Sequence, residues 1–528
     1  MTAASMSVQA LVGRFATDTP FELPVIDYRL LMPILIILGA GVVSVVIEAF
    51  APRRARRPLQ LILVLGSLVA AFIAVVGLAG TQTTTAAGSI AVDGPALVMQ
   101  GAILVIALLG GLLMAERMVD PSGDAFAPRA SALPGSDDER QFAARGYLQT
   151  EVWPLFLFAV GGMLLFPASN DLLIMFVALE VMSLPLYLLA GLARRRRLLS
   201  QEAAMKYFLL GAFSSAFFLY GAALIYGYAG SVDLPVIAAQ LSGKPSESAI
   251  VLIGLGMLLV GLLFKIGAVP FHQWTPDVYQ GAPTAVTGFM AATVKIAAFG
   301  ALFRVLYVAF GGMRWDWAPM MWIVAILTML IGSIIAITQT DIKRMLAYSS
   351  IAQAGFILVG LIAASPAGLA GAMFYLIAYG FTTIGAFAVI TMVRDGNGEA
   401  THLSKWAGLG KKSPLVATLF SVFMLSLAGI PLTSGFIGKF SVFTAAIEAG
   451  AGWLVIVAVV ASLIAAFFYV RVIVLMFFSE PNDQTATVAI PSVFTTIALA
   501  AAATITIVLG IVPQPLIELL ANADVFVR

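Results

Sequence analysis

The sequence predicts an all-α, polytopic membrane protein with about fourteen transmembrane helices. Of its 528 residues, 61% are hydrophobic and only 11% are charged, whereas soluble domains are about 45–50% apolar and about 25% charged. Apolar runs of about 20 residues, the length that crosses a bilayer, recur along nearly the whole chain. Two of these runs are interrupted near their middle. No large soluble domain is expected.

Each predicted span is an apolar run bounded by polar, proline-rich or glycine-rich residues. The spans cover residues 30–50, 59–80, 94–116, 151–168, 171–193, 203–228, 248–270, 283–309, 317–338, 343–363, 367–393, 414–446, 451–478 and 489–513. They predict four regions. Residues 1–150 hold helices 1–3 and a cytoplasmic loop, 151–309 a first group (helices 4–8), 310–478 a second group (helices 9–13), and 479–528 helix 14.

Basic residues collect in alternate loops, which predicts the orientation. They are Arg53, Arg54, Arg56, Arg57, Arg194 to Arg197, Lys343, Arg344, Arg394, Lys405, Lys411 and Lys412. The positive-inside rule places these loops in the cytoplasm and both termini outside. The N-terminal residues lack the basic segment that precedes the apolar core of a cleaved signal, so we expect the first span to be retained. The longest cytoplasmic loop, 117–148, is polar and rich in small residues. It is interpreted as a flexible insertion without chemistry.

The amino-acid composition excludes several kinds of cofactor and metal site. Cysteine is absent, which excludes disulfides and Cys-ligated iron–sulfur clusters. The two histidines, His272 and His402, are too few for a dedicated haem or zinc site. A net charge of +2 gives no indication of a nucleic-acid partner.

The two interrupted spans predict broken helices. Span 7 contains GAVPF at 267–271, followed by Pro276 and Pro283, and span 12 contains Gly429 and Pro431. Proline removes a backbone donor and restricts the preceding residue. Broken backbone at membrane depth is tolerated only where protein or a water-filled cavity covers it. Two such spans, five helices apart and opposite in direction, indicate inverted repeats over helices 4–8 and 9–13.

Ionisable residues within these spans predict a proton relay. Glu180 lies nine residues after Asp171, about 14 Å into its span, and Lys295 lies about 18 Å beyond Pro283. Lys265 precedes the first break and Lys439 follows the second. Burial favours the neutral form of lysine, whereas a nearby carboxylate favours the ammonium. Glu180 and Lys265 are therefore predicted to form a tunable pair.

Other charged residues have plausible structural roles. Lys206, four residues after Glu202 on one helix face, is either a relay residue or an interfacial lysine. Lys343 and Arg344 are interpreted as topology charges, and Arg304 and Arg471 as structural partners or snorkelling side chains. His272 and Asp277 fit a cap, a hinge or proton handling equally well.

Three motifs carry a resemblance to a known family. PFHQWTPDVYQGAPTAVTGFMAATVK (270–295), TQTDIKRMLAYSSIAQAGF (338–356) and SLAGIPLTSGFIGKF (426–440) resemble the antiporter-like membrane subunits of respiratory complex I. The stretch 202–221 and Lys439 favour the N-type branch of that family. The resemblance implies a proton path from Glu180 and Lys265 through Lys295 to Lys439, with Lys206 near its cytoplasmic end. Gln353 departs from the family, because many relatives have histidine there and glutamine does not carry protons.

The resemblance also implies the setting of the chain. It implies a subunit of a proton-translocating NADH:quinone oxidoreductase in a bacterial plasma membrane, with M-type and K-type membrane subunits and lipids as neighbours. NADH, FMN, iron–sulfur clusters and quinone would belong to partner subunits, and no cofactor, metal or redox site is expected in this chain. A subunit of a cation/proton antiporter, a scaffold without transport activity and a small-solute carrier remain alternatives.

Overall fold

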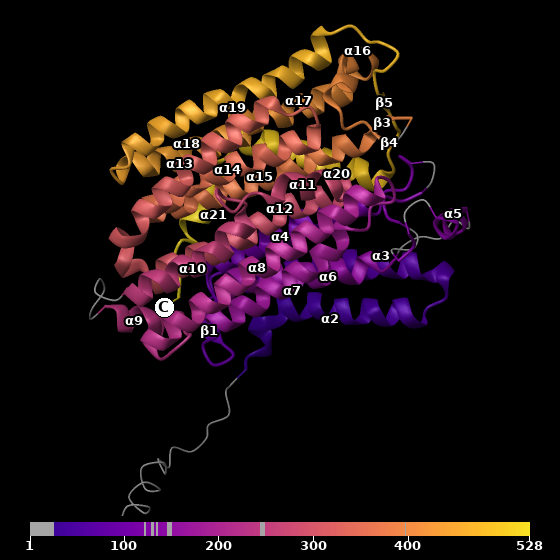
Figure 1. Cartoon of the computed structure of the whole chain (residues 1–528). Coiled ribbons are helices and arrows are strands. Elements are labelled where there is room, and N and C mark those ends of the chain that lie inside the picture. The colour runs from indigo at the N-terminus through magenta and orange to yellow at the C-terminus, as the bar shows by residue number, and fades with distance from the viewer. Residues whose placement is uncertain are drawn as a thin grey trace, which may run out of the picture.

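A computed structural model shows one bundle of long helices (Figure 1). It describes residues 26–120, 123–127, 131–133, 136–144, 150–242, 249–396 and 398–527. Twelve helices in this part of the chain are long and apolar enough to cross a membrane, and α6 and α17 are shorter apolar helices. Together they account for all fourteen predicted spans. The predicted all-α fold is confirmed.

The N-terminal region contributes three long helices and a short hairpin. Its elements are α2 (Tyr28–Phe50), α3 (Arg53–Gly77), β1 (Thr83–Thr85), β2 (Ile90–Val92), α4 (Gly94–Met114) and the short α5 (Asp137–Ala144). Asp27 and Asp93 cap α2 and α4 by accepting hydrogen bonds from backbone N–H groups of the first turn.

The next group of elements contains the first broken helix. It comprises α6 (Val152–Ala168), α7 (Leu172–Ala190), α8 (Arg197–Ala229), α9 (Leu234–Leu241), α10 (Ala249–Ile266), α11 (Trp274–Gly281), α12 (Thr284–Arg304), the π-helical turn η1 (Val305–Ala309) and the 3₁₀ turn η2 (Gly311–Met313). Helix α10 ends before Gly267, whose φ of +78° favours glycine. The chain resumes as α11 after Pro270, so the predicted break is confirmed.

The following group contains the second broken helix. It comprises α13 (Arg314–Thr338), α14 (Ile342–Ala363), α15 (Pro366–Met392), β3 (Val393–Asp395), β4 (Gly398–Glu399), η3 (Leu403–Trp406), α16 (Leu409–Lys412), α17 (Pro414–Ala428), α18 (Ser434–Glu448) and α19 (Gly452–Phe478). Helix α17 ends before Gly429, which has φ +82°. Strand β5 (Thr487–Val488), α20 (Val493–Ile511) and α21 (Gln514–Ala521) complete the chain.

Helices α12, α14 and α15 form the centre of the bundle. The most apolar 18-residue windows of α12 and α15 are wholly buried and that of α14 is 94% buried, whereas those of α2, α3, α8 and α19 are at most 39% buried. A helix buried on every side needs no polar face, and its polar residues then lie in the protein interior. This places Lys295 of α12 and the polar residues of α14 at the centre.

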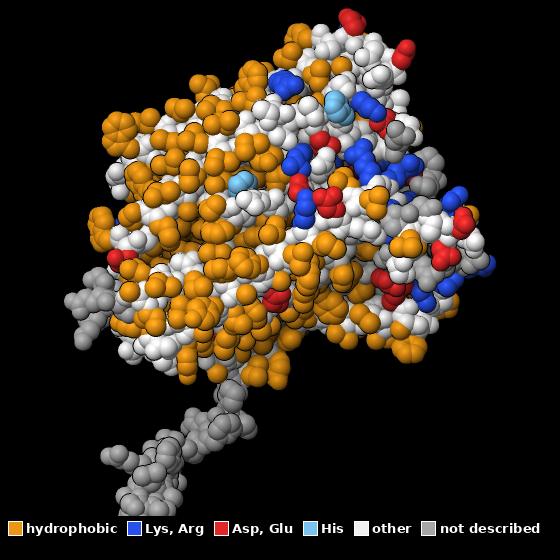
Figure 2. Space-filling view, viewed as in Figure 1, with side chains coloured by type: hydrophobic (Ala, Val, Ile, Leu, Met, Phe, Trp, Pro, Cys, Tyr) orange, Lys and Arg blue, Asp and Glu red, His pale blue; other side chains and the backbone are white. Residues whose placement is uncertain are grey.

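The surface is apolar over the sides of the bundle and charged at one end (Figure 2). The charged end carries α5, β3, β4 and α16, and the β1–β2 hairpin and α9 lie at the other (Figure 1). We call these the basic end and the hairpin end. Large apolar side chains such as Phe213, Ile323 and Leu463 are exposed on the sides, as expected for a surface in contact with lipid.

Candidate functional site

Lys265, in the last turn of α10, lies in an aromatic pocket. Its side chain is 2% exposed. Its Nζ donates a hydrogen bond to Tyr187 Oη at 3.1 Å and lies 5.0 Å and 5.3 Å from the ring centroids of Tyr187 and Tyr207. Aromatic faces attract a cation through their quadrupole. The pocket can therefore hold the ammonium without a carboxylate in direct contact.

Glu180 lies on α7, half-buried. Its Oε1 is buried and makes no hydrogen bond. Among the described residues, no ion pair of 4 Å or less joins Glu180 to Lys265. The predicted pair is therefore open in this structure, and the carboxylate keeps a free acceptor.

Lys295, on the fully buried α12, is bound by two backbone carbonyls. Its Nζ donates to the oxygen of Ile266 at 3.1 Å and to that of Ser350 at 2.7 Å. Ile266 is the last residue of α10. Its carbonyl is free because the helix breaks there, and the C-terminal end of a helix carries partial negative charge. The first break thus provides an acceptor for the central lysine.

Lys439, on α18, repeats this arrangement at the second break. Its Nζ donates to the carbonyl oxygens of Leu427 at 3.1 Å and Ala428 at 2.9 Å, and to Ser462 Oγ at 2.9 Å. Leu427 and Ala428 end α17. Lys295 and Lys439 are therefore both bound by the carbonyl end of a broken helix.

Polar side chains of α14 and its neighbours lie around each of these two lysines. Tyr379 Oη donates to Ser350 Oγ at 2.8 Å. Deeper along α14, Gln353 Nε2 donates to Leu427 O at 2.8 Å and to Tyr469 Oη at 3.1 Å, and Gln353 accepts a hydrogen bond from Tyr375. Gln353 and Lys439 thus share the Leu427 carbonyl. The sequence analysis singled out Gln353 but missed the three tyrosines, because tyrosines in apolar runs do not stand out.

Lys206 lies apart from this interior set. Its side chain is 42% exposed and forms ion pairs with Glu202 and Asp277, both at 2.7 Å. The second oxygen of Asp277 pairs with Arg344 at 2.6 Å. The predicted Glu202–Lys206 contact is confirmed. The structure does not bring Lys206 into contact with Lys265. His272, beside the first break, is half-buried, and its Nδ1 has no hydrogen bond.

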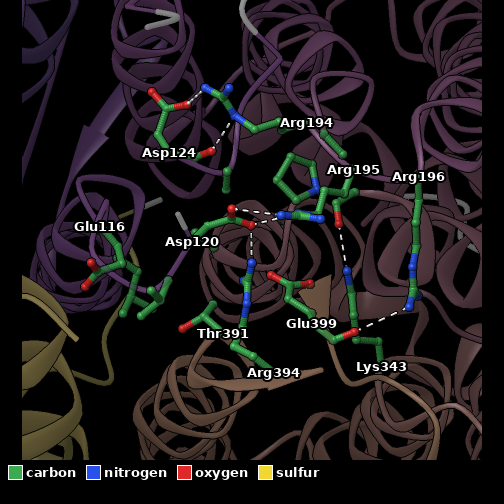
Figure 3. A pocket seen from close by; sticks show the side chains of 18 of the residues that line it. Glu116, Asp120, Asp124, Arg194, Arg195, Arg196, Lys343, Thr391, Arg394 and Glu399 are labelled. Carbon is green, nitrogen blue, oxygen red and sulfur yellow. Dashed lines mark hydrogen bonds and ion pairs between the residues drawn. The ribbon is translucent and has the colours of Figure 1, made fainter. Parts of the chain in front are cut away.

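A network of charged side chains joins the two groups of helices at the basic end (Figure 3). Asp120 binds Arg195, between α7 and α8, at 2.8 Å and also binds Arg394 of β3. Asp124 binds Arg194 at 2.7 Å. Burial raises the pKa of Asp124, and its contacts with Arg194 oppose that rise.

This network includes part of loop 117–148, which the sequence analysis interpreted as a flexible insertion. Asp120 and Asp124 are buried in the interface, where a carboxylate requires a partner. The charges of the loop therefore stabilise this interface. Residues 121–122, 128–130, 134–135 and 145–149 lie outside the described part of the chain.

Lys343, which the sequence analysis interpreted as a topology charge, lies in the protein interior. Its side chain is 3% exposed, and its Nζ donates to the carbonyl of Ala282 at 2.7 Å. Arg344, the neighbouring residue, is partly exposed and paired with Asp277. The two adjacent basic residues therefore lie in different environments.

Comparisons with known proteins agree with this architecture. A family model described as NADH:quinone oxidoreductase/Mrp antiporter, TM, matches residues 169–465. The chain is 60% identical over 524 residues to NADH-quinone oxidoreductase subunit N of Rhodococcus opacus, covering 96% of this chain and 97% of the relative. It is 58% identical over 535 residues to NADH-quinone oxidoreductase subunit N 3 of Streptomyces griseus, covering 97% of each.

Two solved structures have the same fold. One is a chain of respiratory complex I from Thermus thermophilus with bound aureothin, with 33% identity, a TM-score of 0.75 and coverage of 93% of this chain and 100% of that chain. The other is a chain of the Mrp complex from Dietzia sp., with 25% identity, a TM-score of 0.78 and coverage of 94% and 97%.

Proposed function

Because this chain belongs to the family of NADH:quinone oxidoreductase and Mrp antiporter membrane subunits, within the branch of the N subunits, we propose that it moves protons through buried side chains. It is an antiporter-like, multi-pass membrane subunit of a bacterial complex. The proposed relay consists of Glu180, Lys265, Lys295 and Lys439, with Lys206 as a less central member near one end. The energy comes from redox chemistry in partner subunits, among which we expect M-type and K-type neighbours.

The observation that carries this proposal is the binding of Lys295 and Lys439 by carbonyls at the ends of broken helices. A buried lysine paired with a carboxylate is held in its charged form, because removing the proton would leave an uncompensated buried charge. A carbonyl has no net charge. It accepts a hydrogen bond from either the ammonium or the neutral amine. Both protonation states are therefore accommodated, as a relay requires.

Glu180 is the proposed switch on Lys265. Closing the Glu180–Lys265 pair would stabilise the ammonium, and opening it would favour release of the proton. Moving one charge through 100 mV corresponds to about 2.3 kcal/mol, and an opposite charge at 4 Å contributes about 4 kcal/mol at an effective dielectric constant of 20. Opening or closing this pair therefore changes the stability of the ammonium by an energy comparable to that of the step.

The orientation and the repeats belong to the same proposal. The positive-inside rule makes the basic end cytoplasmic.

The helices of the two groups pack in the same pattern. In the first group, the first helix, α6, contacts the second and the last, α7 and α12. In the second group, α13 contacts α14 and α19 in the same way. The third helix of each group contacts the broken helix, as α8 contacts α10, and α15 contacts α17 and α18. Matching packing supports two inverted repeats over 151–309 and 310–478.

A cation/proton antiporter subunit is the second candidate function, favoured by the fold shared with the Mrp chain. The higher identity to the oxidoreductase N subunits favours the first. The two candidates differ in their energy source. Proton movement that needs NADH and quinone supports the oxidoreductase subunit, whereas proton movement that depends on sodium supports the antiporter.

The test is Lys265→Met in the assembled complex, with Arg471→Met as the matched control. Arg471 is an exposed basic residue on α19 that donates to the Ile337 carbonyl. We expect Lys265→Met to lower NADH-driven proton pumping about tenfold, which corresponds to about 1.4 kcal/mol in the barrier, and Arg471→Met to lower it less than about twofold, or 0.4 kcal/mol. Near-normal pumping by an assembled Lys265→Met complex would refute a central role for Lys265.

A further inference from the structure

We propose that Lys343 is a further proton carrier, which takes protons from a charged cavity at the basic end and passes them toward Lys295. This inference rests on the proposed function, because it specifies how protons reach the relay. It assigns chemistry to a residue that the sequence places among topology charges. Three features carry it, namely the cavity, the partner of Lys343 and the polar groups between Lys343 and Lys295.

The cavity opens between the two helix groups at the basic end (Figure 3). It has a volume of about 70 Å³ and is lined by charged side chains from the loop after α4, the α7–α8 turn and the β3–β4 hairpin. One water molecule needs about 10–15 Å³, so the cavity holds several. Arg195 and Glu399, which line it, are partly exposed, so the cavity reaches the surface.

Lys343 lines this cavity at the start of α14, between solvent and the protein interior. Its Nζ donates to the carbonyl oxygen of Ala282, just before α12 begins. Among the described residues no carboxylate lies within 4 Å of it, although Asp341 and Glu399 act on it electrostatically from farther away and Arg196 opposes them. A buried charge kept for structure alone is normally paired with an opposite charge. Lys343 instead has the neutral type of partner that also binds Lys295 and Lys439.

A second, smaller cavity lies on the inner side of Lys343. It has a volume of about 10 Å³ and is lined by Leu346 and Ser349 of α14 and by Tyr379 and Thr383 of α15, among others. One water molecule needs about 10–15 Å³. Thr383 Oγ1 is buried and makes no hydrogen bond of good geometry, although Tyr379 lies close to it. The cavity therefore offers space and polar groups for a single water.

Tyr379 leads from this cavity to Lys295. Its hydroxyl donates to Ser350 Oγ at 2.8 Å, and the Ser350 carbonyl accepts the hydrogen bond from Lys295 at 2.7 Å. Lys343 and Ser350 are seven residues apart on α14, so they lie on one face of the helix, separated by a rise of about 10.5 Å. The smaller cavity and Tyr379 bridge this interval.

The transfer balances without any other reactant. The Lys343 ammonium gives a proton to water in the smaller cavity, which passes one to the Tyr379 oxygen as that hydroxyl passes its own to Ser350. The Ser350 hydroxyl then gives a proton to the neutral amine of Lys295, which lies beside this residue because its Nζ hydrogen-bonds to the Ser350 carbonyl. Each oxygen keeps its number of protons, Lys343 ends neutral, and water in the charged cavity protonates it again. Hydroxyl groups can pass the proton along because each hydroxyl both donates and accepts a hydrogen bond.

The test compares Lys343→Met and Lys343→Arg with Lys411→Met in the assembled complex, reconstituted in vesicles. Lys411 is an exposed lysine at the same end, paired with Glu480. Arginine keeps the charge and a donor for the Ala282 carbonyl but does not release its proton. We expect both Lys343 variants to lower proton pumping per NADH oxidised about tenfold, or 1.4 kcal/mol in the barrier. Lys411→Met should pump normally.

A purely structural role predicts that Lys343→Arg restores pumping, and this result would overturn the inference. Lys295→Met, measured in parallel, separates the two proposals. If it stops pumping while Lys343→Arg pumps normally, only the inference fails, and if Lys295→Met pumps normally, the proposed relay itself fails. If the Lys343 variants do not assemble, Thr383→Val decides. It keeps the shape of the side chain and removes the hydroxyl, and normal pumping by this variant would overturn the inference.

Discussion

Replacing Arg304 with methionine should strongly destabilise this subunit. Arg304 ends α12 near the hairpin end, and both it and Asp93 are fully buried. Its Nη2 donates to both carboxylate oxygens of Asp93, at 2.7 Å and 2.8 Å, and its Nε donates to the Pro167 carbonyl at 2.8 Å. Methionine removes all three hydrogen bonds and leaves a buried carboxylate without its cation.

The magnitude follows from the burial of the pair. Removing one partner of a buried ion pair costs about 3–5 kcal/mol, because the other charge stays uncompensated. Asp93 retains hydrogen bonds from the backbone N–H groups of Ala96 and Val527. Because these bonds still stabilise the carboxylate, the expected cost lies at the lower end of this range. Because 1 kcal/mol shifts the melting temperature of a large domain by about 2 °C, a fall of about 6 °C is expected.

The assay is heating of the purified complex while the retention of this subunit is followed. Arg471→Met is the control, since its exposed guanidinium donates a hydrogen bond to the Ile337 carbonyl and should contribute less than about 1 kcal/mol. The double variant Asp93→Asn/Arg304→Met should recover part of the loss, because it removes the unpaired charge and keeps an N-cap side chain for α4. Equal melting temperatures for Arg304→Met and Arg471→Met would refute the reasoning.

Two further predictions concern the basic end. Asp120→Asn should lower stability by about 1.5–3 kcal/mol, since Arg394 loses a charged hydrogen-bond partner; thermal release of the subunit measures this, and an unchanged melting temperature would contradict it. Burial raises the pKa of Glu116, but the nearby polar groups of Thr495, Met118 and Ser492 outweigh it, and the pKa lies below its usual value. The stabilisation by Glu116 is therefore complete above its unfolded-state pKa and lost as pH falls through the folded-state value. Glu116→Gln should make stability less dependent on pH in that acidic range, whereas identical pH profiles of the variant and wild type would exclude this role.

The hydropathy of the sequence, together with the glycine and proline residues that break two helices, was sufficient to predict most of this fold. Long apolar runs have few structural options in a membrane, because every backbone group must be satisfied within the segment. This is why the fourteen predicted spans coincide with helices. Both breaks followed from glycine and proline at 267–270 and 429–431, and the resemblance to the complex I membrane subunits is confirmed by relatives of up to 60% identity. The proposed proton relay remains a prediction.

The partners of the charged residues could not be predicted in the same way. Asp120 and Arg394 are 274 positions apart, and their contact exists only because two helix groups meet at the basic end. Arg304 and Arg471 look alike in sequence, but one is fully buried against Asp93 and the other is exposed. Likewise, Lys343 and Arg344 are neighbours in the first turn of α14, and only the direction of each side chain separates an interior lysine from a surface ion pair.

The nature of the partner separates two interior arginines from three interior lysines. Arg194 and Arg304 bind carboxylates in buried ion pairs, which is the arrangement of a structural charge. Lys295, Lys343 and Lys439 bind neutral oxygen atoms. A neutral partner does not trap the proton, so each of these lysines can exist in two protonation states at moderate cost. Arginine never loses its proton in a protein. Among these five residues, only the lysines combine a neutral partner with a proton that can leave, as a proton path requires.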